Sequence, residues 1–228
     1  MRPILYLLLA ICLCAGTGSC KKSSSGGGLA ALNFIEANNT IPGVAINFTT
    51  SPIPFYENQN LISYASSYEF GIPAGANPFV IVNSADTSKP LFAGTFNVKA
   101  GGIYSFYLCG EGLDTLFMQD IIPVQPDSNA GARFVDLCTD CGTVNVTQQG
   151  NSQPDFVGLG YKQVTAFKSY SANSSVLNNG GYNYVVTDGS GNQVATFNWN
   201  PPTFKNNTLV ICGVDSLQSV QVFPVNNY

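Results

Sequence analysis

The sequence contains no histidine, and this absence excludes several kinds of chemistry at once. Histidine is the usual general base of Ser–His–Asp triads and Cys–His dyads, and it is a common zinc ligand. The chain also lacks a Gly-x-Ser-x-Gly nucleophile motif and a phosphate-binding glycine loop that leads into a helix. We therefore predict neither a cofactor nor a metal site.

Charged residues are also scarce, at 10% of the chain. With 9 Lys+Arg against 13 Asp+Glu, the formal net charge is -4, and no basic stripe is present to bind nucleic acid. The acidic residues are scattered, so they form no recognisable carboxylate pair for glycoside hydrolysis and no cluster for calcium. We therefore do not expect an enzyme. Hydrophobic residues make up 45% of the chain, which is enough for a packed core.

The first residues are expected to form a secretory signal peptide, which we place at residues 1–19. A positive charge at Arg2 precedes an unbroken apolar run over residues 4–15, and small residues follow it. The run is shorter than the roughly 20 residues that a membrane-spanning helix needs. Gly18-Ser19-Cys20 resembles the lipobox of bacterial lipoproteins, although Thr17 stands where leucine is commoner. The resemblance implies that lipid is attached to Cys20.

Residues 20–28 are expected to tether the lipid to the first domain. Lys21 and Lys22 can meet lipid phosphates, and the Ser/Gly segment that follows is typical of a flexible coil. The membrane is therefore the first expected partner, reached through the N-terminal lipid. We expect a membrane-anchored lipoprotein of the cell envelope, in the outer membrane of a Gram-negative bacterium.

The rest of the chain contains an internal repeat. Four matched pairs recur in the same order at separations of 100, 103, 101 and 101 residues: Phe34 and Phe134, Cys109 and Cys212, Asp114 and Asp215, Pro123 and Pro224. Ordered matches at nearly one spacing favour tandem duplication. We therefore place one domain at residues 29–125 and a second at residues 130–228, with a polar, turn-forming segment between them.

Within each repeat the apolar residues alternate with a period of two rather than 3.6, which favours strands over helices. β-branched and aromatic residues are bounded by Gly, Pro, Asn and Asp. Strands are expected over residues 44–48, 79–82, 92–98, 104–108, 143–147, 164–170, 182–187, 193–199 and 208–212. Each repeat has the length of one immunoglobulin-like sandwich. The predicted fold is all-β, with two tandem immunoglobulin-like β-sandwiches after the signal peptide and the tether.

Turn motifs add a family resemblance. Pro-Ala-Gly and Ala-Gly turns occur within residues 68–75 and 92–106, and Arg133-Phe134-Val135 opens the second repeat. These features resemble a family of repeated Ig-like domains of unknown function that occurs in bacterial envelope lipoproteins. The resemblance implies a fold and a surface location, but no chemistry. The second repeat departs from the family, because Pro201-Pro202 replaces one of the Ala-Gly turns.

Four cysteines remain after Cys20, and they allow three pairings. Cys138 and Cys141 lie in one loop between the first two strands of the second repeat, so we predict a disulfide between them. A bond from Cys212 to either one is the alternative. Redox activity of the Cys-x-x-Cys pair would need a neighbouring cation or helix N-terminus, and none is recognisable. Cys109 and Cys212 are interpreted as buried small hydrophobic residues, which leaves no four-cysteine zinc site.

The aromatic residues offer candidates for ligand binding. Trp199 is the only tryptophan, and its place in the strand alternation predicts a core position. Four tyrosines of the second repeat are better candidates for stacking on a ligand such as a sugar: Tyr161, Tyr170, Tyr182 and Tyr184. A structural role for these tyrosines is the alternative.

Two short motifs resemble the Asp-Ser/Thr-aliphatic sequon of O-glycosylated envelope proteins in some Gram-negative bacteria. They are Asp114-Thr115-Leu116 and Asp215-Ser216-Leu217, which would place glycans on Thr115 and Ser216. The alternative is a turn in which the aspartate accepts hydrogen bonds from the following backbone.

The sequence as a whole predicts a lipid-anchored, non-catalytic cell-envelope protein. It would act as a binding, adhesion or structural module with a glycan or an envelope protein as its ligand. An accessory subunit of an outer-membrane uptake or secretion complex, docked through a strand edge, is the alternative. A glycan-active hydrolase is a third and less favoured hypothesis.

Overall fold

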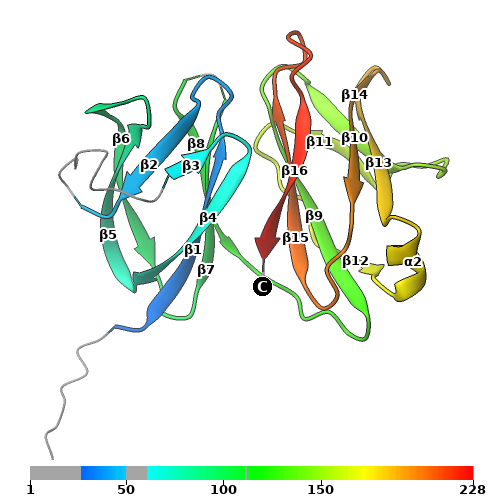
Figure 1. Cartoon of the computed structure of the whole chain (residues 1–228), viewed down its shortest axis with the longest axis horizontal. Coiled ribbons are helices and arrows are strands. Elements are labelled where there is room, and N and C mark those ends of the chain that lie inside the picture. Colours follow the sequence, from blue (N-terminus) through cyan, green and yellow to red (C-terminus); the bar gives the residue numbers. More distant parts are fainter. Residues whose placement is uncertain (1–26, 50–60, 111, 228) are drawn as a thin grey trace, which may run out of the picture.

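A computed structural model describes residues 27–49, 61–110 and 112–227. These residues form two β-sandwiches that lie side by side (Figure 1). The prediction of an all-β fold with two tandem sandwiches is confirmed. The signal peptide and Cys20 lie outside the described residues. Among the residues that are described, no helix is both long and apolar enough to cross a membrane.

The first sandwich consists of two four-stranded sheets, with the orders β4-β1-β7-β8 and β3-β2-β5-β6. β1 pairs in parallel with β7, and the other neighbours are antiparallel. The strands are β1 (Leu29–Ala37), β2 (Gly43–Asn47), β3 (Leu61–Ser63), β4 (Ser66–Pro73), β5 (Gly75–Asn83), β6 (Asp86–Val98), β7 (Ile103–Cys109) and β8 (Asp114–Asp120).

The second sandwich has the same arrangement, with the sheet orders β12-β9-β15-β16 and β11-β10-β13-β14 and a parallel pair of β9 and β15. This matching strand order is what a duplicated sequence predicts. Its elements are β9 (Asn129–Cys138), β10 (Thr143–Gln148), β11 (Phe156–Gly160), β12 (Lys168–Ser171), the short helix α2 (Ser174–Asn178), β13 (Tyr182–Asp188), β14 (Gln193–Trp199), β15 (Asn206–Gly213) and β16 (Gln221–Asn227).

The expected strands are present with one main difference. The strand predicted over residues 164–170 is shorter, because β12 begins at Lys168, and Val164 makes only an isolated bridge to Val135. β1, β3, β4, β8, β9, β11 and β16 lie outside the expected strand ranges. β3, β4, β8, β11 and β16 lie at sheet edges, whereas β1 and β9 are central strands whose side chains are buried on both faces and therefore show no alternation.

Local hydrogen bonds explain where the hairpins turn. The hairpin after β13 turns at Asp188, whose carboxylate accepts the backbone N–H groups of Ser190 and Asn192 at 2.9 and 2.8 Å. This is how aspartate stabilises a tight turn. β4 and β5 are separated only by Ala74, in the predicted Pro-Ala-Gly turn, where Gly75 adopts a φ of 111° that favours glycine.

Each sandwich encloses its own hydrophobic core. Leu32, Phe34 and Phe106 are central in the first core, and Phe134 and Trp199 are buried in the second. The core position predicted for Trp199 is confirmed, and its indole N–H donates to Asn207 Oδ1 at 3.0 Å. The buried indole is therefore satisfied as a hydrogen-bond donor.

A third apolar cluster lies between the two sandwiches. Its buried members are Ile35, Ala37, Tyr107, Cys109, Val135, Leu137, Val210, Cys212, Phe223 and Val225. They come from the sheets β4-β1-β7-β8 and β12-β9-β15-β16, which we call the inner sheets because they face each other (Figure 1). Alternate side chains of the central strands enter a sandwich core on one face and this cluster on the other. The central strands of the inner sheets, β1, β7, β9 and β15, are therefore buried on both faces, and the two sandwiches pack on each other through this cluster.

Candidate functional site

Two reciprocal tyrosine–cysteine contacts join the inner sheets. The hydroxyl of Tyr64, in the first sandwich, lies 3.4 Å from Cys212 Sγ, and the hydroxyl of Tyr161, in the second, lies 3.8 Å from Cys109 Sγ. Burial raises the pKa of Cys109 to about 11 and that of Cys212 to about 12. Both thiols are free and buried, as predicted. The two repeats thus meet through equivalent surfaces, as the subunits of an isologous dimer do.

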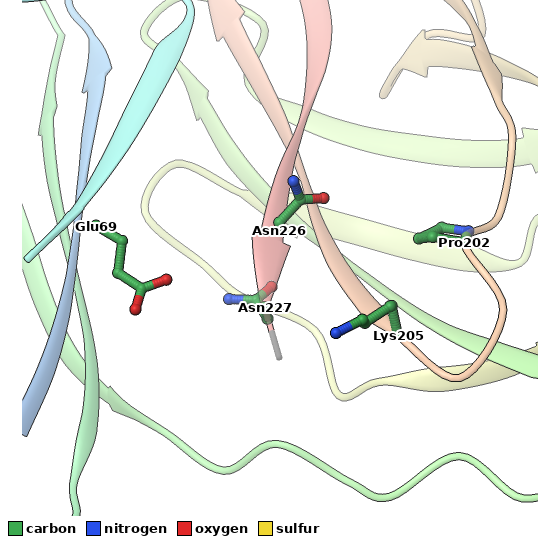
Figure 2. A pocket seen from close by; sticks show the side chains of 5 residues that line it. All are labelled: Glu69, Pro202, Lys205, Asn226 and Asn227. Carbon is green, nitrogen blue, oxygen red and sulfur yellow. The ribbon is translucent and has the colours of Figure 1, made fainter.

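A groove of about 370 Å³ lies beside this interface and is lined by both sandwiches (Figure 2). Glu69, from β4, lies on one side, and Pro202 and Lys205, from the loop before β15, lie on the other. Asn226 and Asn227, at the end of β16, lie between them. The groove therefore exists only because the two sandwiches are held together.

The two asparagines supply amide donors to the groove. Asn227 is 1% exposed, its Oδ1 accepts from Thr208 Oγ1 at 2.6 Å, and its Nδ2 has no hydrogen-bond partner. Asn226 Oδ1 accepts from Asn207 Nδ2 at 2.8 Å, which leaves the amide nitrogen of Asn226 as the group it can donate. A buried donor without a partner costs about 1–3 kcal/mol. An acceptor placed in the groove would recover that cost.

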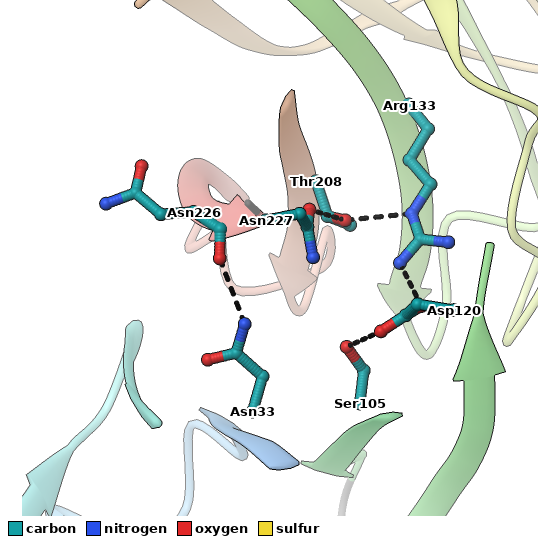
Figure 3. A network of polar contacts seen from close by, with 7 residues as sticks. All are labelled: Asn33, Ser105, Asp120, Arg133, Thr208, Asn226 and Asn227. Carbon is teal, nitrogen blue, oxygen red and sulfur yellow. Dashed lines mark hydrogen bonds and ion pairs between the residues drawn. The ribbon is translucent and has the colours of Figure 1, made fainter. Parts of the chain in front are cut away.

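A buried polar network lies under the groove and crosses between the sandwiches (Figure 3). Arg133 Nη2 pairs with Asp120 Oδ1, and Arg133 Nε donates to Thr208 Oγ1 at 2.8 Å. Asp120 Oδ2 accepts from Ser105 Oγ at 2.7 Å, and the Thr208 hydroxyl continues the chain to Asn227. The ion pair is almost entirely buried, with side-chain exposures of 4% and 0%. The network thus connects a strand of the first sandwich to the floor of the groove.

Further contacts explain why the buried Arg133 cation is tolerated at the interface between the sandwiches. The Arg133 guanidinium lies over the ring of Phe167, 4.7 Å from its centroid, which is favourable for a desolvated cation. Next to the network, Asn33 Nδ2 donates to the backbone oxygen of Asn226 at 2.9 Å and so joins β1 directly to β16. Both contacts limit movement of one sandwich relative to the other.

A second ion pair joins the sandwiches nearer the surface. Asp114 pairs with Lys162, and the Tyr161 hydroxyl donates to Asp114 Oδ2 at 3.0 Å. Burial alone would raise the pKa of Asp114, but hydrogen bonds from Lys162 and Tyr161 bring it below its ordinary value. Gly110 makes room for this contact, because a Cβ there would lie 2.5 Å from the Tyr161 hydroxyl. An exposed pair of this kind stabilises by about 1 kcal/mol at most.

Two carboxyl groups are buried at matching positions of the two repeats. Glu36 in β1 accepts the backbone N–H of Asn38 at 2.8 Å, and Asp136 in β9 accepts that of Cys138 at 2.9 Å. The second oxygen of each carboxyl group has no partner. Burial raises the pKa of Glu36 to about 8 and that of Asp136 to about 7, against the opposing effect of the backbone hydrogen bonds. Both groups therefore carry a proton in mildly acidic solution.

The predicted disulfide between Cys138 and Cys141 is present, with its Cα atoms 5.6 Å apart. The alternative pairing with Cys212 is wrong, because Cys212 is a free thiol. Asp140 lies in the same loop, and its carboxylate oxygen atom lies close to both sulfur atoms. Because the two sulfurs are bonded to each other, they are not thiolates and do not offer a metal the ligands it would need.

Removing the disulfide is expected to have a modest effect. Because the bond closes a very short loop, the double variant Cys138→Ala/Cys141→Ala should lose about 2 kcal/mol in the free energy of unfolding. Urea denaturation under non-reducing conditions measures the difference. Adding a reducing agent should bring the wild-type protein to the stability of the variant. An unchanged urea midpoint in the double variant would show that the bond does not stabilise the loop.

The four candidate ligand-binding tyrosines do not form a common exposed surface. Tyr184 is 1% exposed and belongs to the second core, which favours the structural role over ligand binding. Tyr170 and Tyr182 are partly buried and pack on Trp199, with ring centroids 5.4 and 5.8 Å away. Tyr161 is committed to the contact between the sandwiches. Aromatic stacking on a sugar thus has no support from this set.

The two sequon residues differ in their surroundings. Ser216 is exposed in the loop between β15 and β16, where Asp140 accepts the backbone N–H groups of Asp215 and Ser216 at 2.6 and 3.0 Å. Thr115 is partly buried within β8, and its backbone N–H donates to Asp114 Oδ1 at 2.9 Å. Glycosylation of these residues stays a prediction.

The sequence reasoning missed the network and the groove. In the sequence, Arg133 stands out only as part of the motif that opens the second repeat, and Asp120 belongs to no motif. A signal was present, because arginine is rarely buried without a partner and Arg133 stands in an apolar strand. The groove gives no such signal, since Glu69 and Lys205 are exposed residues 136 positions apart in the chain.

Comparison with known proteins gives only remote likenesses. No protein-family profile and no curated protein matches the chain. The Bacillus anthracis TIE protein is similar over 82% of this chain, at 12% identity and a TM-score of 0.24, and the match covers 33% of that protein. A candidate adhesin from Bacteroides ovatus is similar over 88% of this chain and 95% of its own, at 9% identity and a TM-score of 0.23. Likenesses of this strength assign neither a family nor a function.

Proposed function

We propose that the chain is a lipid-anchored, non-catalytic protein of the cell envelope that binds a glycan or protein ligand as an adhesion or binding module. The observation that carries the proposal is the groove between the sandwiches. Residues of both domains line it, and its floor holds a buried amide donor, Asn227 Nδ2, that has no partner. Ligand sites occur preferentially at domain interfaces, with a few well-placed polar groups.

The connection between the sandwiches supports this function. The apolar cluster between the inner sheets and the Arg133–Asp120 pair fix the two walls of the groove relative to each other. A binding site loses less conformational entropy on binding when its walls are already in place. The anchor on Cys20 would then hold a pre-formed site at the membrane.

The anchor is tested by changing its acceptor residue. Wild-type protein expressed from the full chain is expected in the membrane fraction, and Cys20→Ala is expected to lose its acyl chains and to leave that fraction. Labelling with a radioactive fatty acid and fractionation measure both effects. Cys14→Ala is the matched control, because it changes a cysteine of the signal that is not the acceptor, and it should behave as wild type. Membrane retention of unlabelled Cys20→Ala would contradict lipidation at this residue.

Ligand binding is tested with glycan arrays and with defined envelope proteins as probes. Lys205→Glu reverses a charge at the groove, whereas Lys89→Glu makes the same change on β6, away from it. We expect saturable binding that Lys205→Glu weakens and Lys89→Glu leaves intact. Binding that both variants retain equally would place the ligand elsewhere, and turnover of a glycan would contradict the non-catalytic assignment.

A further inference from the structure

The groove carries opposite charges on its two sides. Glu69 lines it from the first sandwich and Lys205 from the second (Figure 2). These two side chains do not form an ion pair, so their charged atoms are more than 4.0 Å apart. Glu69 is exposed, and its slight burial raises the pKa of its carboxyl group above the ordinary value. A ligand between them meets an acceptor on one side and a cation on the other.

The floor of the groove adds donors on the side of the second sandwich. Asn227 Nδ2 is buried without a partner, and Asn226 has its oxygen already bonded to Asn207. Amide N–H groups next to an ammonium group suit a carboxylate, because each N–H can donate to one of its oxygens. The carboxylate of Glu69 repels a second anion but accepts hydrogen bonds from an amine. The arrangement of charges in the groove therefore suits a ligand that carries one positive and one negative group.

We infer that the groove binds a small zwitterionic ligand, an amino acid or short peptide with a free amine and a free carboxylate. The amine lies at Glu69, and the carboxylate lies at Lys205, Asn226 and Asn227. This inference rests on the proposed binding function and concerns the same groove. Asn227 is its decisive residue, because the carboxylate supplies the acceptor that the buried amide lacks.

The experiment uses the full mature chain from residue 20, made soluble by Cys20→Ala and labelled with ¹⁵N. The dipeptide Ala-Ala is titrated at neutral pH and followed by NMR, with its N-acetylated and C-amidated forms as blocked probes and methyl glucoside as a neutral one. Ala-Ala is expected to shift the side-chain amide signals of Asn226 and Asn227. Each blocked form should bind about threefold more weakly or worse, since it loses one charge-assisted contact.

Matched variants assign each end of the ligand. In Glu69→Gln, Ala-Ala and its N-acetylated form should bind equally, because the partner of the amine is gone. In Lys205→Met, the difference in affinity between Ala-Ala and its C-amidated form should become smaller. In Lys89→Met, that difference should stay as it is in the wild type. Unchanged thermal unfolding of the variants shows that they are folded.

Three results would overturn the inference: no shift with Ala-Ala, equal binding of the blocked forms to wild type, or methyl glucoside shifting the same asparagines as strongly. If the chain binds a glycan or an envelope protein through Lys205 but does not bind Ala-Ala, only the zwitterionic ligand class is ruled out. The proposed binding function would then still stand.

Discussion

Replacing Arg133 with methionine is expected to lower the free energy of unfolding by about 3–5 kcal/mol. The substitution leaves Asp120 buried with only Ser105 as a side-chain donor and removes the donor to Thr208. An unpaired carboxylate in a site with no exposure costs far more than the lost attraction. Urea denaturation of the mature chain measures the effect.

Two further variants show whether the loss comes from the buried pair. Arg133→Met combined with Asp120→Leu removes both charges and should recover much of the stability, because a well-packed apolar pair can replace a buried ion pair. Lys162→Met breaks the half-exposed pair with Asp114 and should cost no more than about 1 kcal/mol. A cost for Arg133→Met as small as that for Lys162→Met would contradict a structural role for the network.

Raising the pH from 5 to 9 is expected to destabilise the protein. In the folded state the pKa of Glu36 is about 8 against an ordinary value of 4.5, and that of Asp136 is about 7 against 3.8. The folded protein therefore holds protons that the unfolded chain releases. The stability from each group is fully present below its ordinary pKa and is lost as the pH rises through its folded pKa. Each loss is of the order of 4 kcal/mol.

Neutral amides test this assignment. Glu36→Gln keeps an oxygen that can accept the Asn38 N–H but has no proton to lose, so its stability should fall less between pH 5 and 9. Asp136→Asn should act in the same way in the second sandwich, and the double variant should be nearly independent of pH in this range. Urea midpoints at each pH measure the effect. A wild-type midpoint that stays level or rises over this range would mean that the two carboxyl groups are charged in the folded protein.

The sequence predicts the fold well because its signals are local. Alternation and turn residues locate most strands, the spacing of two cysteines predicts the Cys138–Cys141 bond, and the repeat predicts one strand order used twice. Tyr184 shows the limit of this reasoning. Its strand offers one face to the core and one to solvent, and a tyrosine is compatible with either, so only the register decides that it is buried.

The docking of the sandwiches and the groove could not be predicted in this way. Val135 and Val210 lie in strands that are apolar on both faces, and the sequence does not say what covers the second face. Glu69 and Lys205 become neighbours of one groove only after that docking. Each looks like an ordinary surface charge in its own repeat. Arg133, buried in an apolar strand, is the one residue from which a partner across the interface could have been inferred.

Calorimetry of the mature chain tests whether the two sandwiches form one unit that holds the groove in place. We predict a single unfolding transition whose calorimetric and van't Hoff enthalpies agree, and which moves as a whole to lower temperature in Arg133→Met. Two separable transitions, one for each sandwich, with Arg133→Met affecting neither or only one of them, would show that the sandwiches unfold independently and do not hold the groove together.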